Sequence, residues 1–326
     1  MAGNGEMVQH LLQGVAKGKI RSLARAITVL ESGDPGGLMG KALFAGESLP
    51  REALGARVVG ITGPPGVGKS SLVDCVIAAF REMGHKVAVI AIDPSSPFSG
   101  GAILGDRIRM QRHSTDRGVF IRSMGTRGHL GGLAAAVPAA VELAAMAGFP
   151  WIIVETVGIG QSEVEIMGLA DTTVVVEAPG LGDDIQAIKA GVMEIGDVFA
   201  VNKADRPGAD RTVLEIEANL DLAMGMYRPK VLRCVARSND GIAELVQAIT
   251  DHMDYLASGP VGSQRRARRY RNWLSAMLYQ RLQQGVDLFL EHQPELNELY
   301  QASARGEKSP GAACDAIVEA IFGPGV

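Results

Sequence analysis

Short β-branched runs alternate with helix-length segments through the middle of the chain, from about residue 57 to residue 235. Strands that are apolar on both faces are typical of parallel sheets, whose strands are joined by helices. The alternation therefore predicts an α/β fold with a mainly parallel sheet flanked by helices. The strand-like runs are RVVGIT, KVAVIAI, VFIRS, WIIVE, TTVVVEA, DVFAVN and KVLRCV.

Helical patterns lie on both sides of this alternation. Apolar residues recur at roughly helical spacing from residue 8 to residue 31, which predicts one or two amphipathic helices. Beyond the last strand, SGPVGSQ at 258–264 predicts a linker. The segment 265–290 then predicts a long helix whose apolar side packs against its own domain or a twin subunit.

These patterns divide the chain into three parts. We expect an N-terminal helical arm over 1–50, a central α/β domain over 51–258 and a C-terminal helical extension over 259–326 that serves dimerisation. A length of 326 residues, with 47% hydrophobic and 21% charged residues, fits one large domain with smaller additions.

Composition and charge narrow the classes of partner. A net charge of −4 argues against bulk binding of nucleic acid, and the basic cluster RRARRYR at 265–271 is more typical of a solvated helix start. No apolar run approaches the roughly 20 residues of a membrane span, and the first residues lack the features of a secretory signal. We expect a cytoplasmic protein with no nucleic-acid or membrane partner.

The cysteines predict buried structural thiols. Cys75, Cys234 and Cys314 lie far apart and form no CxxC pair, so neither a disulfide framework nor a thiolate zinc site is expected.

The segment GITGPPGVGKSSL carries the strongest chemical signal. It fits GxxxxGKS and lies between an apolar strand and a helical pattern, which is the context that a phosphate-binding P-loop requires. In such a loop, backbone N–H groups surround phosphate oxygens, so we expect Lys69 to reach the β- and γ-phosphates and Ser70 to ligate Mg²⁺. The residues expected to bind nucleotide here are Gly63, Gly66, Val67, Gly68, Lys69, Ser70 and Ser71.

The segment VFAVNKAD indicates which base is bound. Asn202, Lys203 and Asp205 form NKxD at the end of a predicted strand. A fixed carboxylate can accept hydrogen bonds from the N1–H and the exocyclic amine of guanine, and adenine presents neither donor at that edge. Together with the P-loop, this segment favours guanine over adenine, so we expect GTP and GDP as ligands.

A carboxylate, Glu155, ends the apolar strand in WIIVETVGIGQSE. Many P-loop enzymes carry an acid there that supports the magnesium shell, and the downstream Gly158 can turn its N–H toward a γ-phosphate. This segment is therefore predicted to sense the nucleotide. Ile159 stands where small GTPases often place a water-orienting glutamine, which predicts slow unassisted hydrolysis. The alternative for Glu155 is a cap on a nearby helix.

Two further carboxylates follow the second strand. Asp93 ends a buried run and Asp106 follows a glycine-rich loop, so both could approach Mg²⁺ or its waters; each could instead cap a helix. The candidate metal set is Ser70, Asp93, Asp106 and Glu155.

Several of these stretches resemble one family over nearly the whole chain. ITGPPGVGKS, AVIAIDPSSPFSGGAILGDRIRM, HLGGLA, VETVGIGQSE, GDDIQAIKAG and VNKAD, in this order and spacing, are similar to the methylmalonyl-CoA mutase-associated GTPase chaperones (MeaB/ArgK/MMAA-type) of the SIMIBI class. The resemblance implies a homodimeric P-loop GTPase that binds an adenosylcobalamin-dependent acyl-CoA mutase. It also implies that the GTPase gates cofactor loading, guards the mutase against inactivation and is stimulated by the complex.

The resemblance also assigns roles to residues. Asp183, Gln186 and Lys189 match a third switch segment that relays the nucleotide state to the mutase; the residues alone predict only an ordinary helix there. The candidate catalytic residues become Lys69, Asp93, Glu155, Gln186 and Lys189.

Two stretches depart from the family pattern. RSMGTRGHLGG at 122–132 leaves the mutase open among methylmalonyl-, isobutyryl-, 2-hydroxyisobutyryl- and ethylmalonyl-type partners. CVARSNDG carries Ala236 and Arg237 where a serine followed by alanine or glycine is usual. The departure changes side chains but leaves the backbone, so Ala236 is expected to contact the base through its backbone.

Two other classes of function remain as alternatives. A metallochaperone GTPase for nickel or cobalt should carry a histidine-rich tract or a CxxC pair, and the histidines here are scattered. A P-loop kinase should prefer ATP, and NKAD argues against that preference.

Overall fold

The computed structural model describes residues 2–31, 55–93, 110–125, 136–156, 168–180, 194–222 and 227–323. The chain divides into two compact units, 1–272 and 273–326. The predicted boundaries at residues 50 and 258 stay a prediction.

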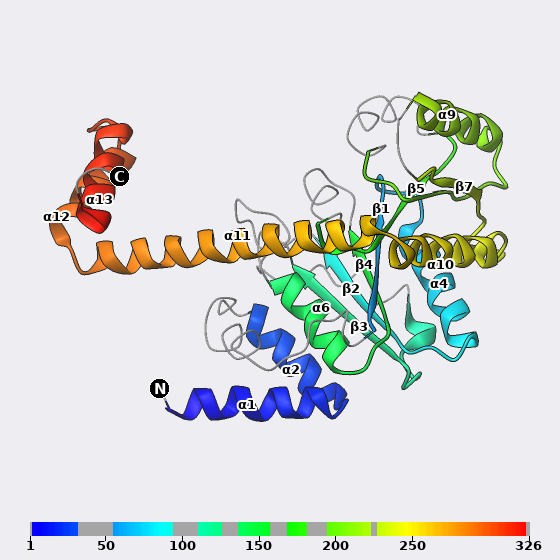
Figure 1. Ribbon diagram of the computed structural model, residues 1–326, viewed down its shortest axis with the longest axis horizontal. Helices are drawn as coiled ribbons and strands as arrows, with labels where there is room; N and C mark the ends of the chain where they lie inside the picture. The colour runs from blue at the N-terminus through cyan, green and yellow to red at the C-terminus, as the bar shows by residue number, and fades with distance from the viewer. Residues whose placement is uncertain are drawn as a thin grey trace. The chain divides into compact units, whose positions relative to one another are not determined.

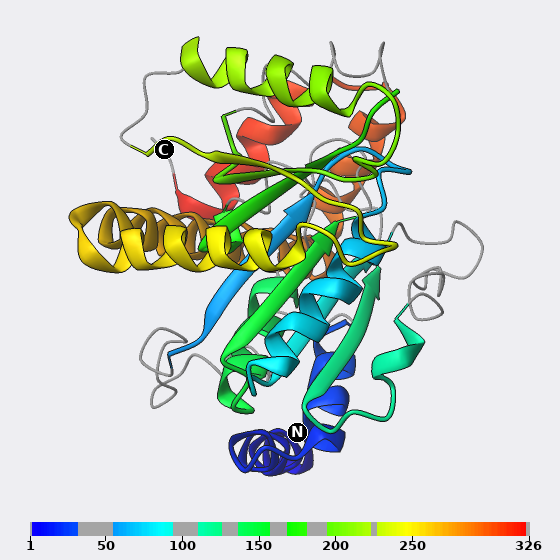
Figure 2. The same ribbon diagram turned by 90° about the vertical axis from the view of Figure 1, so that its right-hand side faces the viewer.

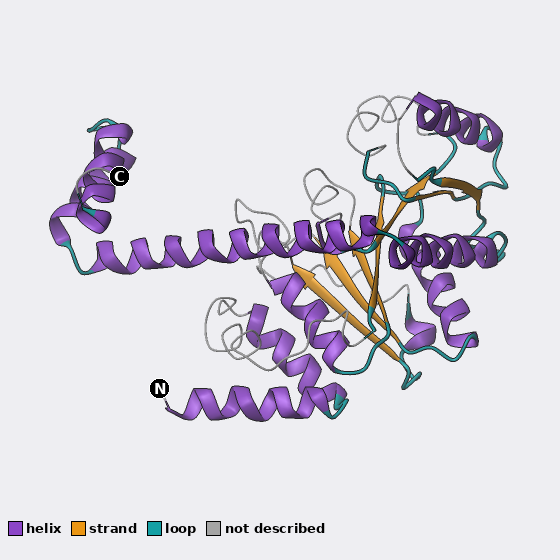
Figure 3. Ribbon diagram, viewed as in Figure 1, coloured by secondary structure: helices purple, strands orange, loops and turns teal. Residues whose placement is uncertain are grey.

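Within the described residues, seven parallel strands form one sheet in the order β3-β2-β4-β1-β5-β6-β7 (Figures 1 and 3). This confirms the predicted fold class, a P-loop NTPase fold with a parallel sheet, and each strand coincides with one of the apolar runs. The strands are β1 (Arg57–Thr62), β2 (Val87–Asp93), β3 (Val119–Gly125), β4 (Trp151–Thr156), β5 (Thr172–Glu177), β6 (Val198–Val201) and β7 (Lys230–Arg233).

Helices cover both faces of the sheet. On one face, α1, α2 and α6 share a core with β2 and β4, while α9 packs on β5 and β6. On the other face, α4 and α10 pack against β1, β2, β5 and β6, and Figure 2 shows them in front of the strands. The helices are α1 (Ala2–Ala16), α2 (Ile20–Glu31), α4 (Lys69–Glu82), the 3-10 turn η1 (Gln111–His113), α6 (Ala136–Met146), α9 (Ala209–Leu222) and α10 (Ile242–Ser258).

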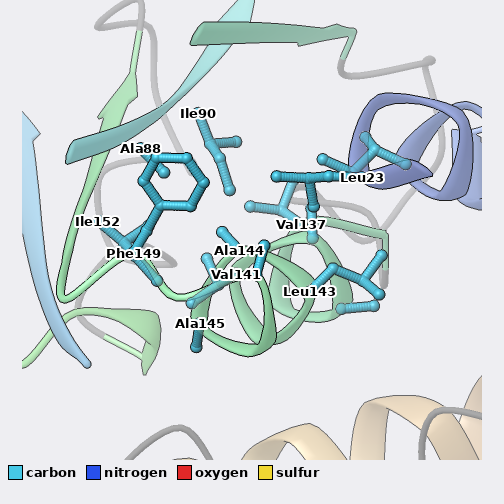
Figure 4. Close-up of a cluster of buried hydrophobic side chains, with 14 of the residues drawn as sticks. Leu23, Ala88, Ile90, Val137, Val141, Leu143, Ala144, Ala145, Phe149 and Ile152 are labelled. Atoms are coloured by element: carbon cyan, nitrogen blue, oxygen red, sulfur yellow. The ribbon is translucent and has the colours of Figure 1, made fainter. Parts of the chain in front are cut away.

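Small side chains bring α6 close to the sheet. Ala144 and Ala145 leave room for Phe149, which lies beside Ile152 and Ala88 of the strands (Figure 4). Leu23 of α2 reaches the same cluster, so the N-terminal helices bury their apolar sides on this face.

We expect Ile152→Val to lower the free energy of unfolding by about 1 kcal/mol, because it removes one methyl group from a close-packed core. Ile152 is fully buried in β4. The matched control is Ile20→Val, whose side chain is 41% exposed at the start of α2 and should change stability by less than about 0.5 kcal/mol. Urea unfolding followed by circular dichroism measures both, and equal losses would contradict the described core.

The predicted linker at 258–264 is wrong except at its second residue. Gly259 has extended backbone (φ −142°, ψ 177°) and separates α10 from α11 (Pro260–Glu291), which runs on without a break. Proline suits the first position of a helix, because the N–H that it lacks would have no partner inside the helix. The second unit contains the later part of α11 together with α12 (Pro294–Ala304) and α13 (Pro310–Phe322).

The basic cluster at 265–271 is not simply a solvated helix start. Arg265 Nη2 lies 2.8 Å from Asp197 Oδ1, and the buried Arg269 places Nη1 2.7 Å from Asp171 Oδ1. The two aspartates directly precede β6 and β5, so the ion pairs hold the first turns of α11 at the amino ends of these strands. The i, i+4 spacing of the arginines is visible in the sequence, but the partners come from distant segments.

Among the described helices, none combines the length and the apolar character that crossing a membrane would need.

Candidate nucleotide site

The loop at 63–68 joins β1 to α4 and depends on glycine at two close approaches. Gly63 has φ +139°, and a Cβ there would lie 2.1 Å from the carbonyl oxygen of Val176 in β5. Gly68 has φ +93°, and a Cβ there would lie 2.5 Å from Asn202 Nδ2. Larger residues would therefore push the loop away from the strands that hold it.

Lys69 is the first residue of α4, and its buried ammonium group lies against the loop. Nζ donates hydrogen bonds to the carbonyl oxygens of Gly63 (2.7 Å) and Pro64 (2.8 Å). The positive end of the α4 dipole adds to this charge, so the loop is an electropositive environment suited to phosphate. Of the other predicted loop residues, Val67 is buried and Ser71 is exposed.

Ser70 and Glu155 meet beside this loop. Ser70 Oγ donates a hydrogen bond of 2.7 Å to Glu155 Oε1, and both side chains are buried. Strand register explains the contact, because Glu155 pairs with Ile61 where β4 and β1 approach their carboxyl ends. A hydroxyl and a carboxylate are oxygen ligands of the type that Mg²⁺ prefers, so the donor set fits this ion.

The remaining predicted metal and switch residues are placed only in part. Asp93 is the last residue of β2, which pairs with β4, so its backbone lies at the same edge of the sheet as Glu155. Asp106, Gly158, Asp183, Gln186 and Lys189 lie outside the described residues.

The NKAD segment lies against the other side of the loop. Asn202 follows β6 and its Nδ2 donates to the carbonyl oxygen of Val67 at 2.8 Å. Lys203 adopts φ +57°, and its Nζ donates to the carbonyl oxygen of Gly66 at 2.5 Å. Asp205 is exposed in the turn that follows, so its carboxylate is accessible to a ligand. The fold thus brings the segments predicted to bind phosphate and base together.

Ala236 joins this group through its backbone. Its N–H donates to Asn202 Oδ1 at 3.1 Å, and its carbonyl oxygen accepts a hydrogen bond from Cys75 Sγ of α4, also at 3.1 Å. The sequence predicted only a buried thiol at Cys75. No motif could have identified the partner, because the contact spans 161 residues.

Burial raises the pKa of the Cys75 thiol, and it raises the pKa of Cys234 to about 12. Both thiols are therefore protonated at neutral pH and act as hydrogen-bond donors rather than nucleophiles.

The parallel sheet, the glycine loop and the lysine at the start of α4 define the chain as a P-loop nucleotide-binding protein. Residues 23–288 match the family described as "Methylmalonyl Co-A mutase-associated GTPase MeaB". The chain belongs to this family, and membership places it among the GTPases associated with methylmalonyl-CoA mutase, which bind GTP and GDP. The resemblance seen in the sequence is thereby confirmed.

Relatives match over nearly the whole chain. A protein of Pyrococcus abyssi that carries the provisional name of a GTPase is 44% identical over 325 residues, 98% of each chain. The Mus musculus protein named "Methylmalonic aciduria type A homolog, mitochondrial" is 33% identical over 96% of this chain and 79% of its own. The crystal structure of a protein named "LAO/AO transport system kinase" matches with a TM-score of 0.68 and 25% identity, covering 97% of this chain and 98% of that one.

Proposed function

We propose that the protein is a GTPase chaperone of an adenosylcobalamin-dependent acyl-CoA mutase. It hydrolyses GTP to gate the loading of the B12 cofactor and to protect or reactivate the mutase. The observation that carries the proposal is the convergence of the loop at 63–68, Glu155 and the NKAD segment in a chain of this family.

In this proposal different groups of the chain bind different parts of the nucleotide. The loop and Lys69 hold the phosphates, Asp205 accepts hydrogen bonds from the guanine edge, and Ser70 with Glu155, Asp93 and Asp106 holds Mg²⁺ directly or through water. When bound, Mg²⁺ neutralises charge on the β- and γ-phosphate oxygens. Ser70 and Glu155 already lie within hydrogen-bond distance, so little rearrangement is needed to present their oxygens.

Gating requires that the mutase binds the GTP-bound and the GDP-bound forms of this protein with different affinities. A ligand shifts a conformational equilibrium only by its differential affinity for the two states, and couplings of this kind are typically about 1 to 3 kcal/mol. Gly158 is our proposed sensor of the γ-phosphate, and the segment of Asp183, Gln186 and Lys189 is our proposed relay to the mutase.

We expect Gln186→Ala and Lys189→Ala to lower mutase-stimulated GTP hydrolysis much more than hydrolysis by the protein alone, because a relay acts only when the partner is bound. The stimulation factor, measured as the rate with mutase divided by the rate without it, should fall by about tenfold, the size of a 1.4 kcal/mol coupling. Lys308→Ala, an exposed lysine between α12 and α13, is the control. Equal losses with and without mutase would make the two residues ordinary parts of the active site.

A homodimer is part of the proposal. Leu274, Leu278 and Leu282 recur at i, i+4 and i+8 along α11 and are 54%, 51% and 52% exposed. An exposed apolar stripe at this spacing suits packing against the same helix of a second copy.

The proposed function is tested by steady-state GTP hydrolysis, alone and with each of several adenosylcobalamin-dependent acyl-CoA mutases. We expect slow hydrolysis alone and strong stimulation by one mutase, which names the partner. ATP is the control substrate, and faster hydrolysis of ATP than of GTP would favour a kinase, the activity for which the solved relative is named. A rate that no mutase changes would overturn the chaperone role. Light scattering on the sample without mutase tests the homodimer.

A further inference from the structure

The backbone of Ala236 is held from two sides by groups that are distant in sequence. Its N–H donates to Asn202 Oδ1 of the NKAD segment and its carbonyl oxygen accepts from Cys75 Sγ, each at 3.1 Å. Asn202 in turn donates to the carbonyl oxygen of Val67. A continuous path of hydrogen bonds therefore runs from α4 through Ala236 and Asn202 to the phosphate loop.

The segment around Ala236 is short and closed. Cys234 N–H donates to the carbonyl oxygen of Val201 at 2.8 Å, and Val235 forms a β-bridge with Asp240. Ala236 lies immediately beyond this bridge, so the contact with Cys75 braces the segment where it leaves the sheet. Without that donor, the carbonyl oxygen of Ala236 would lose its hydrogen bond at a partly buried position beside α4.

The Cys75 thiol is suited to hold the carbonyl oxygen of Ala236. Its side chain is 5% exposed, and it remains protonated at neutral pH, so it is a constant donor. Its place on α4, six residues after Lys69, links the helix that begins at the phosphate loop to the segment beyond β7.

We propose that Cys75 is a positioning residue for guanine recognition, acting through the backbone of Ala236. Because the N–H of Ala236 already donates to Asn202 Oδ1, Cys75 acts by holding Ala236 and, through it, the side chain of Asn202. In the proposed base site Asn202 helps to distinguish the O6 acceptor of guanine from the amine donor that adenine presents at the same position. The inference rests on the proposed base site of Asn202, Asp205 and Ala236, and it adds a residue of α4 to that site.

The test is the affinity of the full-length protein and its variants for GDP, IDP and ADP, measured by titration calorimetry. Cys75→Ala should weaken GDP and IDP alike by about threefold to tenfold, since both bases carry O6, and leave ADP unchanged. Cys75→Ser keeps a hydrogen-bond donor and should restore the ratio of the affinities for GDP and ADP. The matched control is Cys234→Ala, which deletes a buried thiol whose contact, at 3.6 Å, is with the carbonyl oxygen of Gly241. Its GDP/ADP ratio should stay that of the natural protein.

Three results would overturn the inference: an unchanged GDP/ADP ratio in Cys75→Ala, an equal fall in Cys234→Ala, or no rescue by serine. Each would leave Cys75 as a packing residue. Asp205→Asn tests the base site independently of Cys75. GDP carries an exocyclic amine that IDP lacks, so losing the carboxylate that accepts from this amine should lower the affinity for GDP relative to IDP. If Asp205→Asn also retained every preference, the proposed base site itself would be wrong.

Discussion

Lys69→Ala is expected to lower the rate of GTP hydrolysis by roughly 10²- to 10³-fold, the usual effect of removing one preorganised electrostatic group from an active site. Nζ is held over the loop by the carbonyl oxygens of Gly63 and Pro64. In the proposed complex this charge lies beside the β- and γ-phosphates and stabilises the charge that develops during transfer. Alanine favours helix, so the start of α4 should persist. Steady-state hydrolysis and nucleotide titration measure the loss.

The control for this variant is Lys86→Ala, which removes an exposed lysine just before β2 and changes net charge equally. Its hydrolysis rate should match that of the natural protein. Unchanged hydrolysis by Lys69→Ala would remove the assignment of the loop at 63–68 as the phosphate site.

Asp205→Asn is expected to weaken GTP binding by on the order of 10²-fold, because a hydrogen bond to a charged group is lost. The carboxylate can accept from both N1–H and the exocyclic amine of guanine. Asparagine replaces one acceptor oxygen by an NH₂ donor, which opposes a guanine donor but complements the 2-carbonyl of xanthine. Competition between labelled GDP and unlabelled GTP, XTP or ATP should show a shift in preference toward XTP.

Asp287→Asn is the matched control, because Asp287 is exposed on α11 in the second compact unit. It should bind nucleotides as the natural protein does. If Asp205→Asn stayed strictly selective for GTP, the guanine preference would have to arise elsewhere.

The strands were predictable because their signal is local. Each apolar run is continuous, and β1, β4 and β5 are buried at nearly every position, as parallel strands covered on both faces must be. The P-loop and NKAD motifs were also visible, since each chemistry needs particular residue types within a few positions. The order of the strands in the sheet then brings the P-loop and the NKAD segment together, and that order depends on the whole fold.

Two predictions failed, one because the partners of the residues are distant in sequence and one because the local pattern fits two structures. Arg265 and Arg269 looked like a solvated helix start, and nothing local reveals that Asp197 and Asp171 lie within reach. The linker prediction failed because small residues and a proline also suit a helix start, and only packing decides between the two. The roles predicted for Asp106, Gly158, Gln186 and Lys189 stay predictions.

The central position of β1 in the sheet has a consequence for how this GTPase can diversify. Its neighbour on one side is β4, which carries Glu155, and its neighbour on the other side is β5, beyond which β6 leads to the NKAD segment. The group proposed to respond to the terminal phosphate and the groups proposed to select the base therefore lie on opposite flanks of one shared strand. If the proposed roles hold, substitutions on the β4 flank should change the response to the terminal phosphate while the preference for the guanine nucleotide stays the same.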